Sequence, residues 1–253
     1  MAKASAGLNS VLSITETAEG PAILTPELQL RFRRLDDRWT HAIDVGPTDP
    51  PTDPWPTLAE PVEWFSAAED PGRVVSPVYQ DLEVQRDGAG ALALAVGQAG
   101  PHHFSVSIHV EHRWRRPNLH DMHYSETRLD FDVADRCRGE VLAVECHYMV
   151  HDPPAVLHLG DSTDSGSDER FSRNWRDVLV WKTNTADNYD VLVQGLGDLV
   201  APSRVALVNR AARGWRICIA PCAINASGTN RVRYVWTHTR VLERPEAQGS
   251  PFL

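Results

Sequence analysis

The sequence has few of the features that assign a protein to a common functional class. No apolar stretch in its 253 residues approaches the length of a membrane-spanning helix. The glycine-rich motifs of phosphate-binding and dinucleotide-binding loops are missing, and so is the nucleophile elbow of hydrolases. We therefore expect no membrane partner, and the sequence indicates neither a nucleotide cofactor nor a catalytic nucleophile.

Cysteine is also scarce. The four cysteines have neither the C-x2-C pairs of a zinc site nor the density of a disulfide framework; they are Cys137, Cys146, Cys218 and Cys222. We expect them to be reduced thiols, which are typical of the cell interior. The first residues lack the continuous apolar core of a signal peptide. Both observations predict a cytoplasmic protein.

Positive charge is in the minority. The chain has 34 acidic and 25 basic residues, which gives a net charge of −9. A phosphate backbone would be repelled by such a chain unless its basic groups were strongly segregated. Acidic residues lie close to the basic clusters at 31–34 and 113–116, so the sequence shows no such segregation. We expect no nucleic-acid partner.

Alternation of apolar and polar residues is the dominant pattern, and long helical periodicity is hard to find. The apolar fraction of 42% is enough for a packed core, and large sandwiches of this length commonly form one unit. The sequence therefore predicts an all-β, antiparallel β-sandwich of ten or more strands in a single domain, residues 1–253. We expect flexible ends at residues 1–20 and 245–253.

Three consecutive strands show the cleanest alternation, at residues 103–114, 124–134 and 140–151. Two hairpins precede them, within 28–45 and 79–97, where turn residues separate two alternating segments. We expect the three strands to lie side by side, with the last two joined as a hairpin. Their polar side chains would then share one surface.

Residues 46–77 interrupt this pattern because they are rich in proline. Proline cannot donate a hydrogen bond to a neighbouring strand, so we do not expect this segment in a sheet. Only about 45 residues precede it, too few for a separate sandwich. We expect a long surface excursion that crosses the domain as a lid or belt, with Trp55 and Trp64 anchoring it to the core.

The polar faces of the three consecutive strands hold the candidate site. Opposed side chains on neighbouring strands lie about 5 Å apart, close enough to share a proton or a metal. This face is rich in histidine and contains no lysine. The candidate catalytic residues, which have the chemistry of an acid–base pair or of a divalent metal site, are His109, Glu145 and His147. The candidate ligand-binding residues are His103, Glu111, Glu126, Arg128, Trp236 and His238.

Three functions are compatible with this face. The first, which we favour, is binding of a small molecule such as a saccharide. The second is an acid–base enzyme that acts on a sugar-like ligand. The third is a structural or interaction module that docks another protein or a second copy of the chain, and a polar sheet face with no further role is the simplest explanation. A concave face covered by residues 46–77 would favour the first two functions, and a flat, exposed face would favour the third.

Overall fold

The protein is described by a computed structural model, which defines most of the strands and the turns between them. The described residues are 12–46, 55–62, 74–115, 123–137, 143–151, 155–159, 175–176, 178–183, 189–196, 203–211, 214–222 and 228–242. Within these ranges the chain forms strands, turns and loops, and no helix has the length and hydropathy that crossing a membrane requires.

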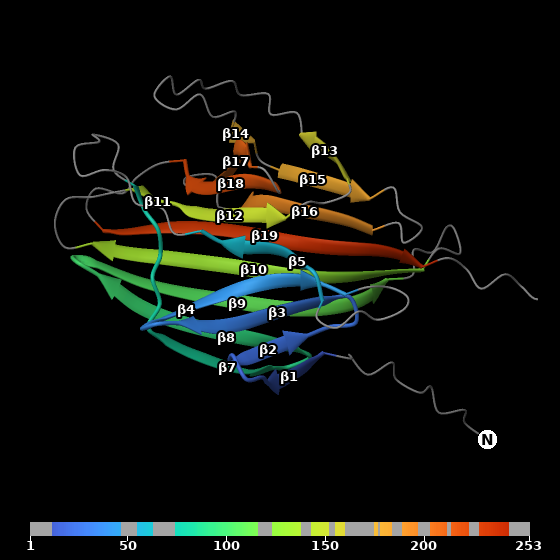
Figure 1. Cartoon of the computed structure of the whole chain (residues 1–253), viewed down its shortest axis with the longest axis horizontal. Coiled ribbons are helices and arrows are strands. Elements are labelled where there is room, and N and C mark those ends of the chain that lie inside the picture. The colour runs from blue at the N-terminus through green and yellow to red at the C-terminus, as the bar shows by residue number, and fades with distance from the viewer. Residues whose placement is uncertain are drawn as a thin grey trace, which may run out of the picture.

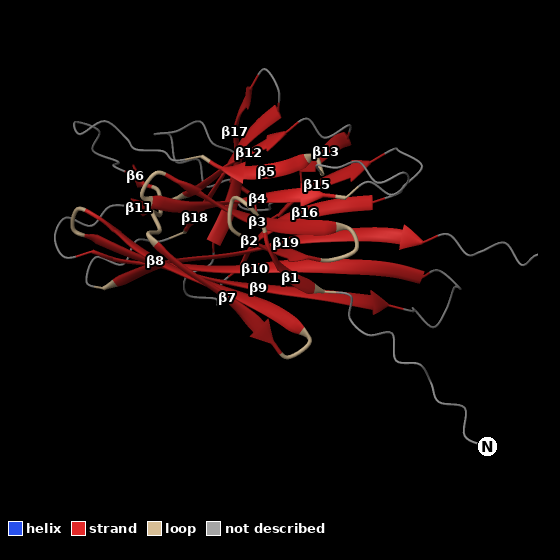
Figure 2. Ribbon diagram, turned by 60° about the horizontal axis from the view of Figure 1, so that its bottom comes forward, coloured by secondary structure: helices blue, strands red, loops and turns tan. Residues whose placement is uncertain are grey.

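The strands form two large sheets that pack face to face (Figure 1 and Figure 2). The nine-stranded sheet contains, in spatial order, β1 (Ser13–Glu16), β2 (Pro21–Leu24), β3 (Leu28–Leu35), β4 (Arg38–Val45), β5 (Thr57–Pro61), β12 (Cys146–His151), β18 (Gly214–Pro221), β17 (Ser203–Ala211) and β14 (Trp175–Arg176). The eight-stranded sheet contains β13 (Ala155–Leu159), β15 (Val178–Thr183), β16 (Tyr189–Leu196), β19 (Thr229–Leu242), β10 (His123–Cys137), β9 (His102–Arg115), β8 (Gly90–Ala99) and β7 (Asp81–Asp87). A two-stranded parallel sheet joins β6 (Val74–Val75) to β11 (Ala143–Val144). The predicted all-β, antiparallel sandwich is confirmed.

The core lies between the two large sheets and follows the predicted alternation. The inward side chains of β9 are Phe104, Val106, Ile108 and Val110, and all are buried. The neighbouring β10 contributes Leu129, Phe131 and Val133, whereas the nine-stranded sheet contributes residues such as Leu30, Ile43 and Ile217. Phe131 stacks on Tyr234 of β19, with 4.7 Å between the ring centroids. Burial of these side chains is the main favourable contribution to folding.

The proline-rich segment does contribute a strand, which corrects one expectation. β5 lies inside the nine-stranded sheet, where Ala59 pairs with Ile43 of β4 and with Val150 of β12. Pro56 precedes the strand and Pro61 is its last residue. Pro56 therefore lies outside the ladder, and Pro61, which pairs with Tyr148, stands at its end, so neither proline interrupts the middle of the ladder. Residues 47–54 and 63–73 lie outside the described part of the chain.

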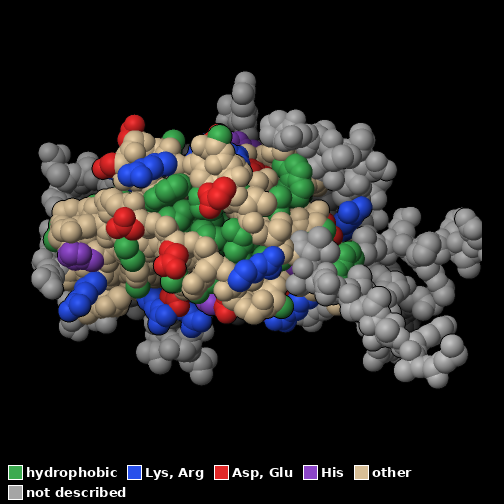
Figure 3. Space-filling model, turned by 90° about the horizontal axis from the view of Figure 1, so that it is seen from below, with side chains coloured by type: hydrophobic (Ala, Val, Ile, Leu, Met, Phe, Trp, Pro, Cys, Tyr) green, Lys and Arg blue, Asp and Glu red, His purple; other side chains and the backbone are tan. Residues whose placement is uncertain are grey.

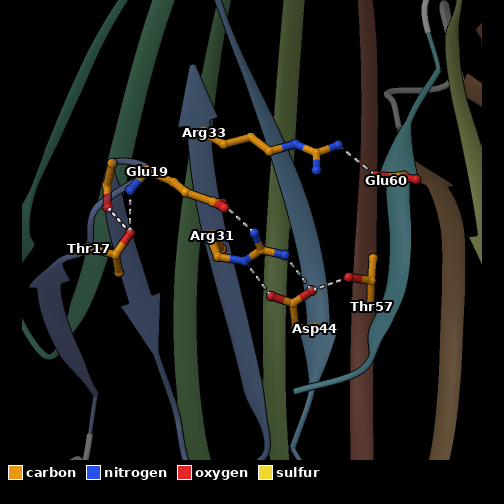
Figure 4. Close-up of polar contacts among 8 residues, drawn as sticks. Thr17, Glu19, Arg31, Arg33, Asp44, Thr57 and Glu60 are labelled. Carbon is orange, nitrogen blue, oxygen red and sulfur yellow. Dashed lines mark hydrogen bonds and ion pairs between the residues drawn. The ribbon is translucent and has the colours of Figure 1, made fainter. Parts of the chain in front are cut away.

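Polar contacts on the outer face hold β5 against its neighbours (Figure 4). The buried carboxylate of Asp44 accepts hydrogen bonds from Arg31 at 2.9 Å and from the Thr57 hydroxyl at 2.8 Å. Glu60 of β5 accepts a hydrogen bond from Arg33 at 2.8 Å. Strands β3, β4 and β5 are thus linked by side chains as well as by their backbone ladder.

Strand pairing confirms some predicted neighbours and overturns others. The two predicted hairpins form as β3–β4 and β7–β8, and β9 lies beside β10. However, the predicted hairpin between β10 and the strand at 140–151 is wrong. β10 pairs with β9 and β19, whereas β12 pairs with β5 and β18 in the opposite sheet.

The expected flexible N-terminus is also partly wrong. Residues 13–16 form β1, which pairs with β2 at the edge of the nine-stranded sheet. Residues 1–11 and the predicted flexible tail at 245–253 lie outside the described residues. The four cysteines are free thiols, as their spacing predicts.

Candidate functional site

Five of the predicted site residues share the outer face of β9 and β10; they are His103, His109, Glu111, Glu126 and Arg128. The side chain of His109 is 47% exposed and lies 3.4 Å from Asp87. Arg128, which is 43% exposed, donates two hydrogen bonds to Asp130, and Glu111 accepts one from Arg113. These contacts are those of a solvated sheet face, and exposed ion pairs of this kind contribute little to stability.

The surface seen from the edge that carries β1 and β7 also has side chains of both charges. Acidic and basic side chains are scattered over it, with hydrophobic side chains between them (Figure 3). Neither sign of charge dominates this view.

The other predicted site residues lie elsewhere, so the expected common surface does not form. His147 belongs to β12 of the nine-stranded sheet and Glu145 lies just before that strand, so both are on the opposite side of the sandwich core from the outer face that carries His109. Trp236 and His238 are on β19 of the eight-stranded sheet but face the core, where they are 1% and 2% exposed. The proposed acid–base set of His109, Glu145 and His147 is therefore wrong as a single constellation.

His238 belongs to a row of buried polar residues across three strands. Thr127 of β10 pairs with His112 on one side and with His238 on the other. The His112 Nδ1 atom lies 2.9 Å from the Thr127 hydroxyl. Burial lowers the pKa of His238 to about 4, with smaller contributions from Arg240 and His112. This row joins the two sheets, because the Thr127 hydroxyl also contacts the hydroxyl of Thr25 at 3.2 Å.

A partly open pocket lies between β4 and β12, where β5 ends. Its volume is about 60 Å³. This exceeds the roughly 10–15 Å³ that a cavity needs to hold one water, so the space admits water or a ligand fragment of a few heavy atoms. Its walls include Trp39, His41, Ser76, Tyr79, Tyr148 and Tyr234. Residues from both sheets therefore meet in this pocket.

A chain of hydrogen bonds forms the inner wall of the pocket. The Nε2 atom of His41 lies 3.0 Å from the Tyr148 hydroxyl, which lies 2.7 Å from the hydroxyl of Tyr234. All three side chains are buried within the sandwich. Pro61 is the β5 residue paired with Tyr148. Its short ring fills little of the space that a longer side chain would occupy.

Burial keeps the three side chains of this hydrogen-bonded series, His41, Tyr148 and Tyr234, uncharged. It lowers the pKa of His41 to about 3, and it raises the pKa values of Tyr148 and Tyr234 well above 10. The pKa of the neighbouring Cys146 thiol rises to about 12, chiefly by burial. At neutral pH the inner wall therefore presents a neutral imidazole and protonated hydroxyl groups.

The sequence alone does not reveal this pocket, because its residues come from separate segments. His41, Tyr148 and Tyr234 belong to β4, β12 and β19, and no local spacing relates them. One signal was available in the alternation of β4. His41 is in phase with the apolar Ile43 and Val45, and a histidine on a predicted core face requires a buried hydrogen-bond partner.

Neither a protein-family model nor a curated protein matches this sequence.

Proposed function

We propose that the protein binds a small, uncharged molecule in the pocket between β4 and β12. The observation that carries this proposal is the chain from His41 through Tyr148 to Tyr234 on its inner wall. Ligand sites are commonly concave and largely apolar, with a few convergent polar groups that orient the ligand. This pocket combines those polar groups with the rings of Trp39 and Tyr79.

The preference for an uncharged ligand follows from His41. Its pKa of about 3 keeps the imidazole neutral at physiological pH, so it offers no positive charge to a carboxylate or phosphate. A buried charged ligand without a countercharge would bear a large desolvation cost. A carbonyl, hydroxyl or amide group can instead exchange hydrogen bonds with the imidazole and the hydroxyls.

Binding is better supported than acid–base catalysis. A general base is most efficient when its pKa lies near the operating pH, and that of His41 lies far below it. Carbohydrate binding is a narrower form of the proposal, since the aromatic rings of Trp39 and Tyr79 offer a surface for the apolar face of a sugar. The volume of the pocket restricts such a ligand to the insertion of one part of its ring.

A screen of paired ligands tests the proposal. Small ketones, alcohols, amides and monosaccharides are compared with carboxylate and amine analogues of the same size, with binding measured by ligand-observed NMR. We expect binding from the neutral members. Tyr148→Phe should weaken it about tenfold, the effect of one lost hydrogen bond. Tyr124→Phe is the control, because Tyr124 pairs with Val241 near the end of β19 and does not line the pocket. Binding only of charged ligands, or equal affinities in both variants, would contradict the proposal.

A further inference from the structure

A second cluster of buried side chains lies on the outer face of the nine-stranded sheet. His147 of β12 pairs directly with Cys218 of β18. Glu145 lies two residues before His147, just ahead of the start of β12, and its carboxylate contacts the His147 imidazole. Glu145, His147 and Cys218 are 5%, 1% and 0% exposed. Charged and polar side chains are seldom buried this completely unless they are paired or bound to a metal.

The donor atoms of the three side chains converge. The Glu145 Oε2 atom lies 2.7 Å from His147 Nε2 and 3.1 Å from the Cys218 sulfur. One ligand atom from each of the three residues lies within 4.8 Å of the other two. Zinc ligands at bond lengths of about 2.0–2.3 Å stand roughly 3.5 Å apart around a tetrahedral ion. A modest expansion of the cluster is therefore enough to admit the ion.

The backbone holds the three residues in place. Cys218 and His147 are fixed by the β12–β18 ladder, and the amide nitrogen of Glu145 donates a hydrogen bond to the Val75 carbonyl at 3.1 Å. Two of the three ligands therefore lie on paired strands, which position side chains more accurately than loops do. From this geometry we infer that Glu145, His147 and Cys218 form a zinc-binding site.

The combination of ligands selects the metal. Thiolate and imidazole are softer ligands than the oxygen atoms that magnesium and calcium require, and together with a carboxylate they suit Zn²⁺. Binding releases the thiol proton of Cys218 to solvent. The imidazole stays neutral, because its proton moves from Nε2, which takes the metal, to Nδ1.

Arg216 opposes this change. Its guanidinium group lies 3.2 Å from the His147 Nδ1 atom, and arginine has only donors. In the metal-free protein Nδ1 therefore accepts a hydrogen bond and Nε2 donates one to Glu145. With zinc on Nε2, the proton on Nδ1 would face the guanidinium, so Arg216 must move away. The same residues thus form a hydrogen-bond network without metal, and the experiment must distinguish the metal-free protein from the metal-bound protein.

Metal titration of the protein distinguishes a zinc site from a hydrogen-bond network that binds no metal. The protein is dialysed against a chelator and then titrated with Zn²⁺ or Co²⁺. We expect one equivalent to bind, and the Co²⁺ form to show a thiolate-to-metal charge-transfer absorption. Cys218→Ser and His147→Gln should weaken zinc binding by about 100-fold or more. Cys222→Ser is the matched control, because this exposed cysteine lies just beyond the end of β18 and should leave the affinity unchanged.

A further variant tests the role assigned to Arg216. Arg216→Gln replaces a donor with a side chain whose oxygen can accept the Nδ1 proton, and we expect zinc to bind roughly 10-fold more tightly. Absence of stoichiometric binding to the folded wild-type chain would overturn the site. So would a Co²⁺ spectrum without the thiolate absorption, or equal zinc affinities for Cys218→Ser and Cys222→Ser. If Cys218→Ser does not fold, the wild-type Co²⁺ spectrum decides.

Discussion

The His41 Nε2 atom lies 3.0 Å from the Tyr148 hydroxyl, although β5 separates the strands that carry these two residues. Neighbouring strands are about 4.8 Å apart, so the two side chains reach across roughly 10 Å of backbone separation. The same hydroxyl contacts Tyr234 of the opposite sheet. One oxygen atom therefore connects β4, β12 and β19, and it forms part of the proposed ligand pocket.

Removal of this oxygen should destabilise the fold. In Tyr148→Phe, the imidazole of His41 and the hydroxyl of Tyr234 each lose a buried hydrogen-bond partner. We expect the free energy of unfolding to fall by about 1–3 kcal/mol, measured by urea denaturation. The matched Tyr124→Phe variant should change it by less than about 0.5 kcal/mol. Equal losses in the two variants would show that the Tyr148 hydroxyl has no special role.

The stability should depend on pH through His41. Its pKa is about 3 in the folded protein and near 6.5 in an exposed chain, so the unfolded state binds a proton that the folded state cannot. Stability is then complete above about pH 6.5 and falls as the pH drops toward 3, by up to about 1.4 kcal/mol per pH unit.

His41→Phe removes this titration and provides the measurement. The variant should be less stable than the wild type at pH 7, and the difference should shrink by about 2 kcal/mol at pH 5. His238, whose pKa is also lowered by burial, contributes equally to both proteins and cancels. Parallel curves of unfolding free energy against pH would contradict the burial of a neutral His41.

Gly97 should be required for the wall of the pocket. A Cβ atom at this position would lie 2.1 Å from the Val78 carbonyl oxygen and 2.7 Å from the Tyr79 Cα atom. Gly97→Ala therefore forces the backbone beside Tyr79 to move, which should cost about 1–3 kcal/mol and weaken ligand binding. In Gly100→Ala the new Cβ meets no atom within 4 Å, so the stability falls only through the positive φ of 57°, which is unfavourable for alanine. That control should bind ligand normally.

Two arginines should differ sharply in their contribution to stability. Arg31 pairs with Asp44, whose side chain is 2% exposed, whereas Arg128 pairs with Asp130 on the exposed face. Arg31→Met leaves a buried carboxylate with only the Thr57 hydroxyl, and it should cost about 3 kcal/mol. Arg128→Met should cost less than about 1 kcal/mol. Similar unfolding free energies for both variants would contradict this assignment.

The sequence was sufficient to predict the core face of the strands with the clearest alternation, although Trp236 and His238 were expected at a ligand site and face the core. Alternation placed Phe104, Ile108 and Leu129 inside, and it placed Tyr148 correctly on the inner face of its strand. Alternation depends only on the period of side-chain direction along one strand, which is a local property. The class of the fold follows from it.

Strand partners could not be predicted in the same way. β10 and β12 are separated in the chain only by a short segment that contains the two-residue β11, yet they belong to opposite sheets. Their alternation is equally compatible with a hairpin, because a pattern specifies a face and not a neighbour. His147 was consequently expected on the same sheet surface as His109, whereas it lies in the other sheet with Cys218, about 70 residues along the chain, as its cross-strand partner. The pocket was missed for the same reason.

Occupation of the pocket beside Tyr148 by a neutral ligand can be measured by NMR of the protein with ¹³C-labelled tyrosine rings. The chain has five tyrosines, of which Tyr79, Tyr148 and Tyr234 line the pocket and Tyr124 does not. Titration with a neutral ligand from the screen should shift the ring signals of those three residues and leave that of Tyr124 unchanged. Saturable binding that leaves the signals of Tyr148 and Tyr234 in place would show that the ligand binds elsewhere on the protein.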